Sequence, residues 1–384
     1  MRINPVLAAQ GSYPMAQLQD KARQLRADGA PLIDFSIGDP REPTPPAIAQ
    51  ALRDAVPEVS QYPTTAGLPE TRQSIADYVE RRFGVAVDPD TQIIPTSGSK
   101  EAIFSTPLAF VDRNAGDVVI QATPGYPVYE RGAELAGAAV HTVVLDGDFV
   151  FRAELVPDDV WERASMVWIN NPHNPTRSVM TRSDLEDFYT KTRETQTWLL
   201  ADECYVDLYE GVPPTSALEV ADADQSGLLS YLSLSKRSGM TGYRAAAIVG
   251  DARAIGHLKA LRSSAGTASP EFVQAAAQTA WLNDEHVAPR RETFATKRAI
   301  LREAFEDLGF EAVASTAGLY LWVRVPAAMD DVAITARLLD SHVVVSPGRV
   351  FGPGGEGYLR LALVPTVEEC RAAVKVVTEC LTAS

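Results

Sequence analysis

The sequence predicts an α/β fold, with a large domain whose mostly parallel central sheet is flanked by helices, and a smaller α+β domain. Between residues 92 and 250, short apolar runs alternate with segments of helical spacing. The runs are apolar throughout, which is typical of strands buried on both faces, and helical crossovers between such strands give a parallel sheet. A shorter series of strand-like and helical runs closes the chain. We predict 1–45 as an N-terminal arm and part of the small domain, 46–275 as the large domain, and 276–384 as the C-terminal small domain.

The expected elements follow from the spacing of apolar residues and from Gly and Pro punctuation. A short strand is expected within 32–40, and helices are expected at 15–27, 46–55, 71–83, 100–110, 127–137, 181–195, 331–340 and 366–381. The strands of the large sheet are expected in TQIIPT (91–96), DVVIQA (117–122), HTVVL (141–145), SMVWIN (165–170), TWLLAD (197–202), LLSYLSL (228–234) and AAAIVG (245–250). Helices dominate 252–309, with a long one near 271–309 that is expected to break around Pro289. The small domain's strands are expected in GLYLWVRV (318–325), HVVVSPG (342–348) and GYLRLALV (357–364).

Composition excludes several classes of protein. The 384 residues carry a formal charge of −15, which disfavours nucleic acid and anionic membranes as partners. No apolar run approaches the roughly 18 residues of a membrane span, and the N-terminus lacks a secretory h-region, so we expect a cytoplasmic protein. Three scattered cysteines and five histidines without ligand spacing predict neither a disulfide scaffold nor a catalytic metal. A nicotinamide dehydrogenase is disfavoured because no G-x-G-x-x-G opens a βαβ unit, and the Gly-rich 352–357 precedes a strand as a turn.

The segment SYLSLSKRSGMTGYR (230–244) is the most informative for chemistry. An apolar strand ends before Lys236, and ligands of open α/β sheets bind outside the carboxyl ends of strands. A lysine there, with Arg237 beside it, can have a lowered pKa and form a Schiff base. Serines of this segment and Arg244 could donate to one phosphate. For Lys236 alone, a solvated surface charge is the alternative.

Two neighbouring strands also end in polar residues. Asp202 ends WLLAD and could hold a pyridine-type nitrogen protonated, while the Tyr205 phenol could donate to a ring oxygen, provided that the chain turns after Asp202. Asn174, in the Asn/Pro turns after SMVWIN, offers an amide to a ligand. A helix-capping role for Asp202 and plain turn chemistry for Asn174 are the alternatives.

Two further segments indicate anion binding. Ser99 and Lys100 begin a helix after a Gly/Ser turn, where free backbone N–H groups can hold an anion, although a capped helix would look the same. Arg360 lies within an apolar strand, where an unpaired guanidinium is costly. It therefore calls for an anion, either a substrate carboxylate or a protein carboxylate.

Taken together in this chain order, these segments resemble the class I/II aminotransferases of fold type I, which are pyridoxal-phosphate enzymes. The resemblance spans nearly the whole chain and includes Ile37-Gly38-Asp39-Pro40 and the stretch from Tyr62 to Pro69. It implies amino-acid and keto-acid substrates. The large domain would bind pyridoxal 5'-phosphate.

The resemblance implies a role for each matching residue around the cofactor ring. Lys236 would carry the cofactor as a Schiff base and move the proton, and Asp202 would pair with the pyridinium nitrogen. Tyr205 and Asn174 would hydrogen-bond the phenolic oxygen, and Tyr126 would stack on the ring.

The resemblance also implies how the phosphate and the substrate are held. Phosphate ligands would be Arg244, Ser233, Ser235 and the backbone at Ser99 and Lys100. Arg360 would bind the substrate α-carboxylate, with Gly38 and Asn174 nearby. Tyr62 would reach the phosphate of the neighbouring subunit, which implies a homodimer with shared active sites.

Within the family, FSIGDPREPTPP, SQYPTTAGLPETR and SLSKRS most resemble N-succinyl-diaminopimelate aminotransferases of lysine and cell-wall synthesis. Glutamate would then be the donor, and N-succinyl-2-amino-6-ketopimelate the acceptor. Its distal carboxylate needs a second cation, for which Arg41, Arg177 and Arg349 are candidates. The family often has Gly at position 177, so Arg177 could lie near the pocket or in a surface loop.

Three alternatives stay open at this point. The enzyme could be an aminotransferase for aspartate, alanine or aromatic amino acids. It could be another fold type I enzyme such as a C–S lyase, because substrate orientation selects the bond that breaks. A non-catalytic regulator of this fold would need an added DNA-binding domain, and the match beginning within the first 40 residues disfavours it.

Overall fold

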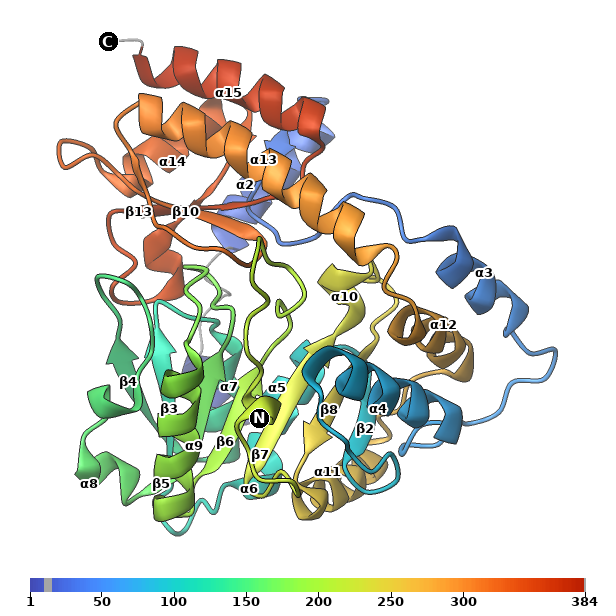
Figure 1. Cartoon of the computed structure of the whole chain (residues 1–384). Helices are drawn as coiled ribbons and strands as arrows, with labels where there is room; N and C mark the ends of the chain where they lie inside the picture. The colour runs from blue at the N-terminus through green and yellow to red at the C-terminus, as the bar shows by residue number, and fades with distance from the viewer. Residues whose placement is uncertain (10–15, 383–384) are drawn as a thin grey trace.

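The computed structural model describes residues 1–9 and 16–382. The chain forms two layered units, with the larger unit below and the smaller one above in Figure 1. The first residue of the expected helix 15–27 lies outside the described residues, and the helix itself is α2 (Ala16–Ala27).

The larger unit is built on a seven-stranded sheet formed within the described residues, in the order β2-β8-β7-β6-β5-β3-β4. Its strands are β2 (Ile93–Thr96), β3 (Val118–Thr123), β4 (Ala139–Val144), β5 (Ala164–Asn170), β6 (Trp198–Asp202), β7 (Leu228–Ser233) and β8 (Ala246–Gly250). Neighbours from β4 to β7 are parallel, whereas β8 is antiparallel to both β7 and β2. The predicted mostly parallel sheet is therefore confirmed.

Helices cover both faces of this sheet because side chains alternate between the faces. One face packs against α4 (Pro69–Phe83), α9 (Arg182–Thr195) and α12 (Glu271–Leu282). The other packs against α5 (Ser99–Ser105), α7 (Val128–Ala136) and α11 (Ala252–Ala265). The helix α3 (Pro46–Asp54) lies on α12 at one end (Figure 1).

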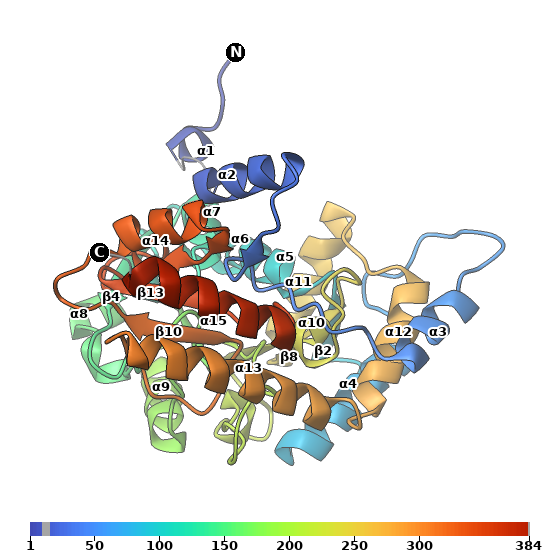
Figure 2. The ribbon, with the colours of Figure 1, turned by 90° about the horizontal axis from the view of Figure 1, so that it is seen from above.

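The smaller unit contains a four-stranded antiparallel sheet in the order β12-β13-β10-β9. These strands are β9 (Glu311–Ala312), β10 (Tyr320–Arg324), β12 (Ser346–Pro347) and β13 (Tyr358–Ala362). Figure 2 shows α13 (Val287–Asp307) and α15 (Val367–Thr382) side by side over this sheet. β1 (Ile33–Asp34) pairs in parallel with β11 (Val343–Val344), which joins the N-terminal segment to this unit near α14 (Asp331–Asp340).

Three expected elements are each divided into two in the structure. The long helix near 271–309 is two helices, and the chain breaks at 283–286 rather than at Pro289, which lies in the first turn of α13 where no N–H partner is lost. The expected helix 100–110 is α5 followed by α6 (Pro107–Phe110), because Pro107 cannot continue the ladder. The expected strand 342–348 is split into β11 and β12.

The predicted domain boundary between 275 and 276 falls inside α12. Residues on both sides of it, such as Val273 and Trp281, pack into the core of the larger unit. We infer that 283–286, between α12 and α13, is the junction.

Candidate active site

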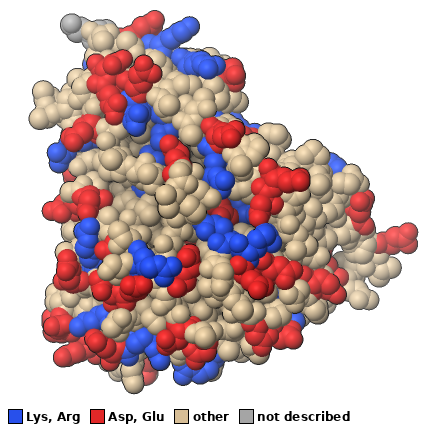
Figure 3. Space-filling view, in the orientation of Figure 1, with Lys and Arg blue, Asp and Glu red and all other residues tan. Residues whose placement is uncertain are grey.

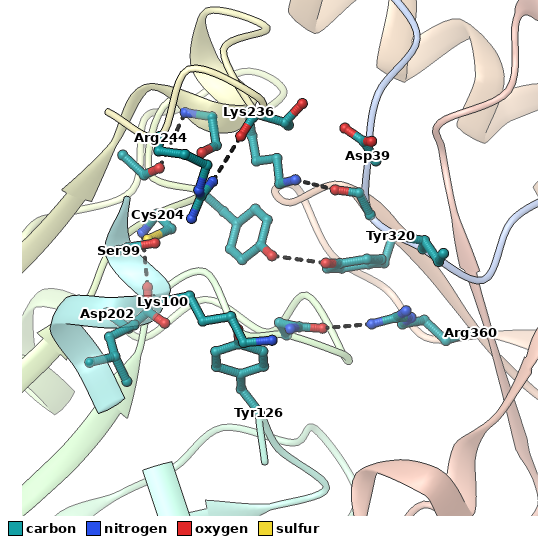
Figure 4. A pocket seen from close by; sticks show the side chains of 18 of the residues that line it. Asp39, Ser99, Lys100, Tyr126, Asp202, Cys204, Lys236, Arg244, Tyr320 and Arg360 are labelled. Atoms are coloured by element: carbon teal, nitrogen blue, oxygen red, sulfur yellow. Dashed lines mark hydrogen bonds between the residues drawn. The ribbon is translucent and has the colours of Figure 1, made fainter. Parts of the chain in front are cut away.

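A cavity of about 460 Å³ lies where the larger sheet meets the smaller unit. That volume is within the range of small-molecule sites, roughly 300–1,000 Å³. Asn170, Asp202 and Tyr231 are aligned across β5, β6 and β7, so the carboxyl ends of three strands open on the same edge. Figure 4 shows side chains from this edge facing side chains from the smaller unit across the cavity.

Lys236 enters the cavity from α10 (Leu234–Arg237), a single helical turn that follows β7 directly. Its ammonium donates a hydrogen bond to the Gly38 carbonyl. Burial lowers the pKa of Lys236 to about 8, and Arg244 and Arg360 act in the same direction while Asp39 opposes them. The lysine is therefore a partly neutral amine near physiological pH.

Asp202 lines the same cavity at the end of β6 and is buried. Its Oδ2 accepts a 2.7 Å hydrogen bond from the Tyr129 hydroxyl, and its Oδ1 accepts one of 3.2 Å from the Cys204 N–H. Burial raises the pKa of Asp202, and hydrogen bonds from the Cys204 thiol, the Tyr129 hydroxyl and the Cys204 N–H oppose the rise. The carboxylate is thus held in one orientation at the cavity wall.

Tyr205 and Asn174 both line the cavity, as the sequence predicts. The chain turns after Asp202, which brings Tyr205 to the same side. The hydroxyls of Tyr205 and Tyr320 are 2.8 Å apart. The backbone N–H of Asn174 donates to Asn170 Oδ1 over 2.7 Å, which fixes the Asn/Pro turn against β5.

One end of the cavity gathers donors suited to a phosphate. It is lined by Ser99, Ser233, Ser235 and Arg244, whereas the side chain of Lys100, another residue of the lining, extends from α5 over Tyr126 (Figure 4). A side chain at Gly98 (φ +87°) would place its Cβ 2.2 Å from Nη2 of Arg244, so the guanidinium lies directly on the turn that begins α5. Arg244 also donates to the Thr241 carbonyl over 2.8 Å.

The opposite end is formed by Arg360 of β13. It donates to the Ser36 carbonyl over 2.6 Å and to Asn174 Oδ1 over 3.2 Å. The guanidinium lies 4.4 Å from the ring centroid of Tyr320 and 4.3 Å from that of Phe351. Among the described residues, buried Nε of Arg360 has no hydrogen-bond partner, so an anion would satisfy it.

The cavity is positive although the chain is acidic. Within the described chain, its lining holds four cations (Lys100, Lys236, Arg244 and Arg360) and two carboxylates (Asp39 and Asp202). Figure 3 shows acidic side chains spread over the outer face and interspersed with basic ones. The field that attracts an anion is therefore local.

The remaining predicted positions are placed as follows. Tyr126 lines the cavity, edge-on to Tyr129 at 5.6 Å, and Gly38 lines it too. Tyr62 lies outside the cavity and is 100% exposed in this single chain.

The three arginines considered for a distal carboxylate all point elsewhere. Arg41 pairs with Glu369 at 2.5 Å, and Arg349 pairs with Asp331. Arg177 is neither in a surface loop nor in the cavity: it is 2% exposed and donates to the carbonyls of Ala317 and Ser315 over 2.6 and 3.0 Å. Its φ of +69° explains why glycine is common at this position.

Several cavity residues were not predicted from the sequence. They are Ser36, Asp39, Cys204, Tyr320 and Phe351, and behind the wall Tyr129. Tyr129 carried a usable signal, since it is three residues after Tyr126 in one helical turn. Tyr320 and Phe351 reach the site only through the packing of the smaller unit.

Comparison with known proteins decides the family. The family model "Aminotransferase class I and II" matches residues 30–377. The chain belongs to this family. The aminotransferase is 36% identical over 372 residues to the LL-diaminopimelate aminotransferase of Aquifex aeolicus, covering 95% of each chain. It is 34% identical to LL-diaminopimelate aminotransferase 2 of a Nostoc species, with 94% of each covered.

Solved structures agree on the fold of the aminotransferase. A probable N-succinyldiaminopimelate aminotransferase from Thermus thermophilus aligns with a TM-score of 0.89 and 28% identity, covering 96% of this chain and 100% of that one. The aspartate aminotransferase of the same organism with maleate aligns with a TM-score of 0.91 and 28% identity, covering 99% and 100%. The predicted fold type I is therefore confirmed.

The aminotransferase uses pyridoxal 5'-phosphate, and the cavity suits this cofactor. An amine, a buried carboxylate and a cationic donor cluster face one space of about 460 Å³. The described residues contain neither a group of three or more His, Cys, Asp or Glu that could hold a metal ion nor a helix long and apolar enough to cross a bilayer.

Proposed function

We propose that the enzyme transfers an amino group between glutamate/2-oxoglutarate and a keto or semialdehyde precursor of diaminopimelate. One observation carries the reaction type: Lys236 and Asp202 face the same cavity, between the Arg244 end and the Arg360 end. Bound pyridoxal phosphate supplies an aldehyde for the amino group and a ring that accepts the electrons of the broken Cα–H bond.

Lys236 holds the cofactor and moves the proton. With its pKa lowered to about 8, roughly one amine in ten is neutral at pH 7 and can attack a carbonyl or accept a proton. The serines and Arg244 would bind the phosphate, and the ionised Asp202 would accept a hydrogen bond from the protonated ring nitrogen. Each of these groups comes from the edge of the larger sheet.

Arg360 selects the bond that reacts. A bidentate contact with the α-carboxylate fixes the substrate by its least variable group, and orientation determines which Cα bond is aligned with the cofactor ring. Ser36 and Asn174 hold the guanidinium in place.

The distal end of the substrate is assigned to Lys100. Lys236, Arg244 and Arg360 have roles in the reaction, whereas Arg41, Arg177 and Arg349 point away from the cavity. Lys100 is the fourth cation of the cavity lining, and burial together with Arg131 and Arg244 lowers its pKa. A distal carboxylate there would offset this accumulation of positive charge.

We infer N-succinyl-2-amino-6-ketopimelate as the acceptor. The segments FSIGDPREPTPP, SQYPTTAGLPETR and SLSKRS support it, as does the likeness to the Thermus enzyme. The names of the Aquifex and Nostoc relatives favour a second candidate, the unsubstituted diaminopimelate precursor. The two acceptors differ in charge, because succinylation replaces a distal ammonium with an amide and a further carboxylate.

We also propose that the site is shared in a homodimer. Tyr62, Val56 and Val59 are exposed apolar side chains on the segment between α3 and α4. A second copy would cover this segment and bring its Tyr62 to the phosphate end.

A substrate panel tests the function. The holoenzyme is mixed with glutamate, and the absorbance of the bound cofactor is followed. Loss of the aldehyde-form band with formation of 2-oxoglutarate is expected. In a separate incubation with cystathionine, formation of pyruvate and ammonia would indicate a C–S lyase. The two diaminopimelate precursors, oxaloacetate, pyruvate and an aromatic keto acid are then compared by kcat/KM. A preference for oxaloacetate or the aromatic acid would refute the diaminopimelate assignment.

A further inference from the structure

Tyr129 stands behind the cavity wall and touches the carboxylate that faces the cofactor. Its hydroxyl donates to Oδ2 of Asp202 over 2.7 Å. The structure describes no salt-bridge partner for Asp202, and its other hydrogen-bond donors are the thiol of Cys204 and the Cys204 N–H, the latter at 3.2 Å. A buried carboxylate without a cation depends on such hydrogen bonds to remain ionised.

The Tyr129 ring is fixed on two sides. It is stacked on Trp168 with centroids 4.9 Å apart and planes 17° apart, and Tyr126 meets it edge-on at 5.6 Å. Tyr126 lies just before α7 and Tyr129 lies in its first turn, where the Tyr129 N–H donates to the Tyr126 carbonyl over 3.3 Å. This turn places one phenol in the cavity and the other behind it. The hydroxyl of Tyr129 therefore has a defined direction toward Asp202.

We propose that Tyr129 is a positioning residue that keeps Asp202 ionised and aimed at the ring nitrogen of the cofactor. The inference rests on the proposed role of Asp202 and goes beyond it. Without this hydrogen bond the buried carboxyl takes up a proton more readily. A neutral acid no longer stabilises a protonated ring nitrogen, so the cofactor is bound less tightly and is a weaker electron acceptor.

The chain offers a matched control in Tyr231. Its hydroxyl also makes a 2.7 Å hydrogen bond, but to Thr106 Oγ1 rather than to a carboxylate. It packs against the same Trp168 at 5.0 Å and is buried like Tyr129, with 0% and 4% exposure respectively. Y231F thus removes an equivalent buried hydroxyl, whose hydrogen bond is to Thr106 and not to Asp202.

The experiment measures dissociation constants of full-length apoenzymes for two cofactors, pyridoxal phosphate and its analogue with carbon in place of the ring nitrogen. For Y129F, we expect pyridoxal phosphate to bind about tenfold more weakly, with the analogue unchanged within twofold. Y231F should change neither constant by more than twofold. Comparing two cofactors on one variant separates an effect on the nitrogen from a general loss of fold.

Two outcomes would overturn the proposal: an equal loss for both cofactors in Y129F, or no loss for either. D202N distinguishes this failure from that of the underlying assignment. If D202N binds pyridoxal phosphate as tightly as the wild type, the role of Asp202 itself is wrong. As a second readout, the acidic limb of the pH profile of kcat should move to higher pH in Y129F, because the carboxyl protonates more readily.

Discussion

The phosphate end of the cavity and its carboxylate end are built from different kinds of structure. Ser233, Lys236 and Asp202 follow neighbouring strands of one sheet, and Arg244 lies on the turn before α5. Arg360 instead meets Ser36 and Asn174, which are 324 and 186 residues away in sequence. The cofactor end is built on the edge of one sheet, whereas the substrate end exists only when the smaller unit is packed on the larger.

Because the two ends are built from different elements, they can be altered separately. A change at the sheet edge should affect the cofactor and hence every substrate. A change around Arg360 should affect substrates and leave cofactor binding nearly intact.

Replacing Lys236 with alanine should have the largest effect. The variant loses both the covalent anchor and the proton carrier, and we expect the rate of the glutamate half-reaction to fall by about 10⁴-fold. Single-turnover spectroscopy of the cofactor band measures it. Turnover near the wild-type level would remove Lys236 from its role.

The variants R360A and R244A test whether the two ends of the cavity act independently. Truncating a group that binds a buried charge costs about 2–5 kcal/mol, or roughly 30- to 5,000-fold. In R360A, kcat/KM should fall by this factor for both substrates, while the dissociation constant for pyridoxal phosphate should stay within about twofold of the wild-type value. R244A should instead weaken binding of the cofactor. If both variants lose the cofactor equally, the two ends are not separable.

Cofactor capture should depend on pH through Lys236. Burial lowers the pKa of this amine to about 8, and only the neutral amine attacks the aldehyde. The rate constant for the reaction of the apoenzyme with pyridoxal phosphate should fall about tenfold per pH unit below pH 8 and level off above that pH. Stopped-flow absorbance from pH 6 to 9.5 measures this, and a midpoint near 10.5 would contradict the lowered pKa.

Lys100→Met should have the smallest effect and act on the distal carboxylate of the substrate, although Lys100 belongs to α5 of the larger unit. We expect the preference for glutamate over alanine in kcat/KM to fall about tenfold, because alanine has no distal carboxylate to lose. Steady-state kinetics with both donors checks it. An equal loss for glutamate and alanine would assign Lys100 to the cofactor.

The elements of the larger sheet could be predicted almost residue by residue. Apolar runs such as SMVWIN and TWLLAD are continuous because both faces of these strands are buried, and this pattern survives in the sequence. Because these runs show where each strand ends, they also allowed the catalytic candidates at the strand ends to be predicted. Boundaries failed where local rules compete, as at Pro289, which a helix tolerates in its first turn.

Arginines show where sequence reasoning stops. Arg177 and Arg360 both lie in buried positions, yet one satisfies backbone carbonyls and the other faces the cavity. Nothing in their neighbouring residues distinguishes these two fates. The choice depends on carbonyls that lie 140 residues from Arg177 and 324 residues from Arg360 in the chain.

The sequence by itself determined the sheet, its strand-end lysine and aspartate, and the family to which they belong, because short-range periodicity and motif order carry that information. Tertiary structure alone decided which cations face the substrate, that Tyr129 supports Asp202, and that Tyr320 and Phe351 flank Arg360. Each of these contacts joins residues of different helices or strands, which meet only when those elements pack together.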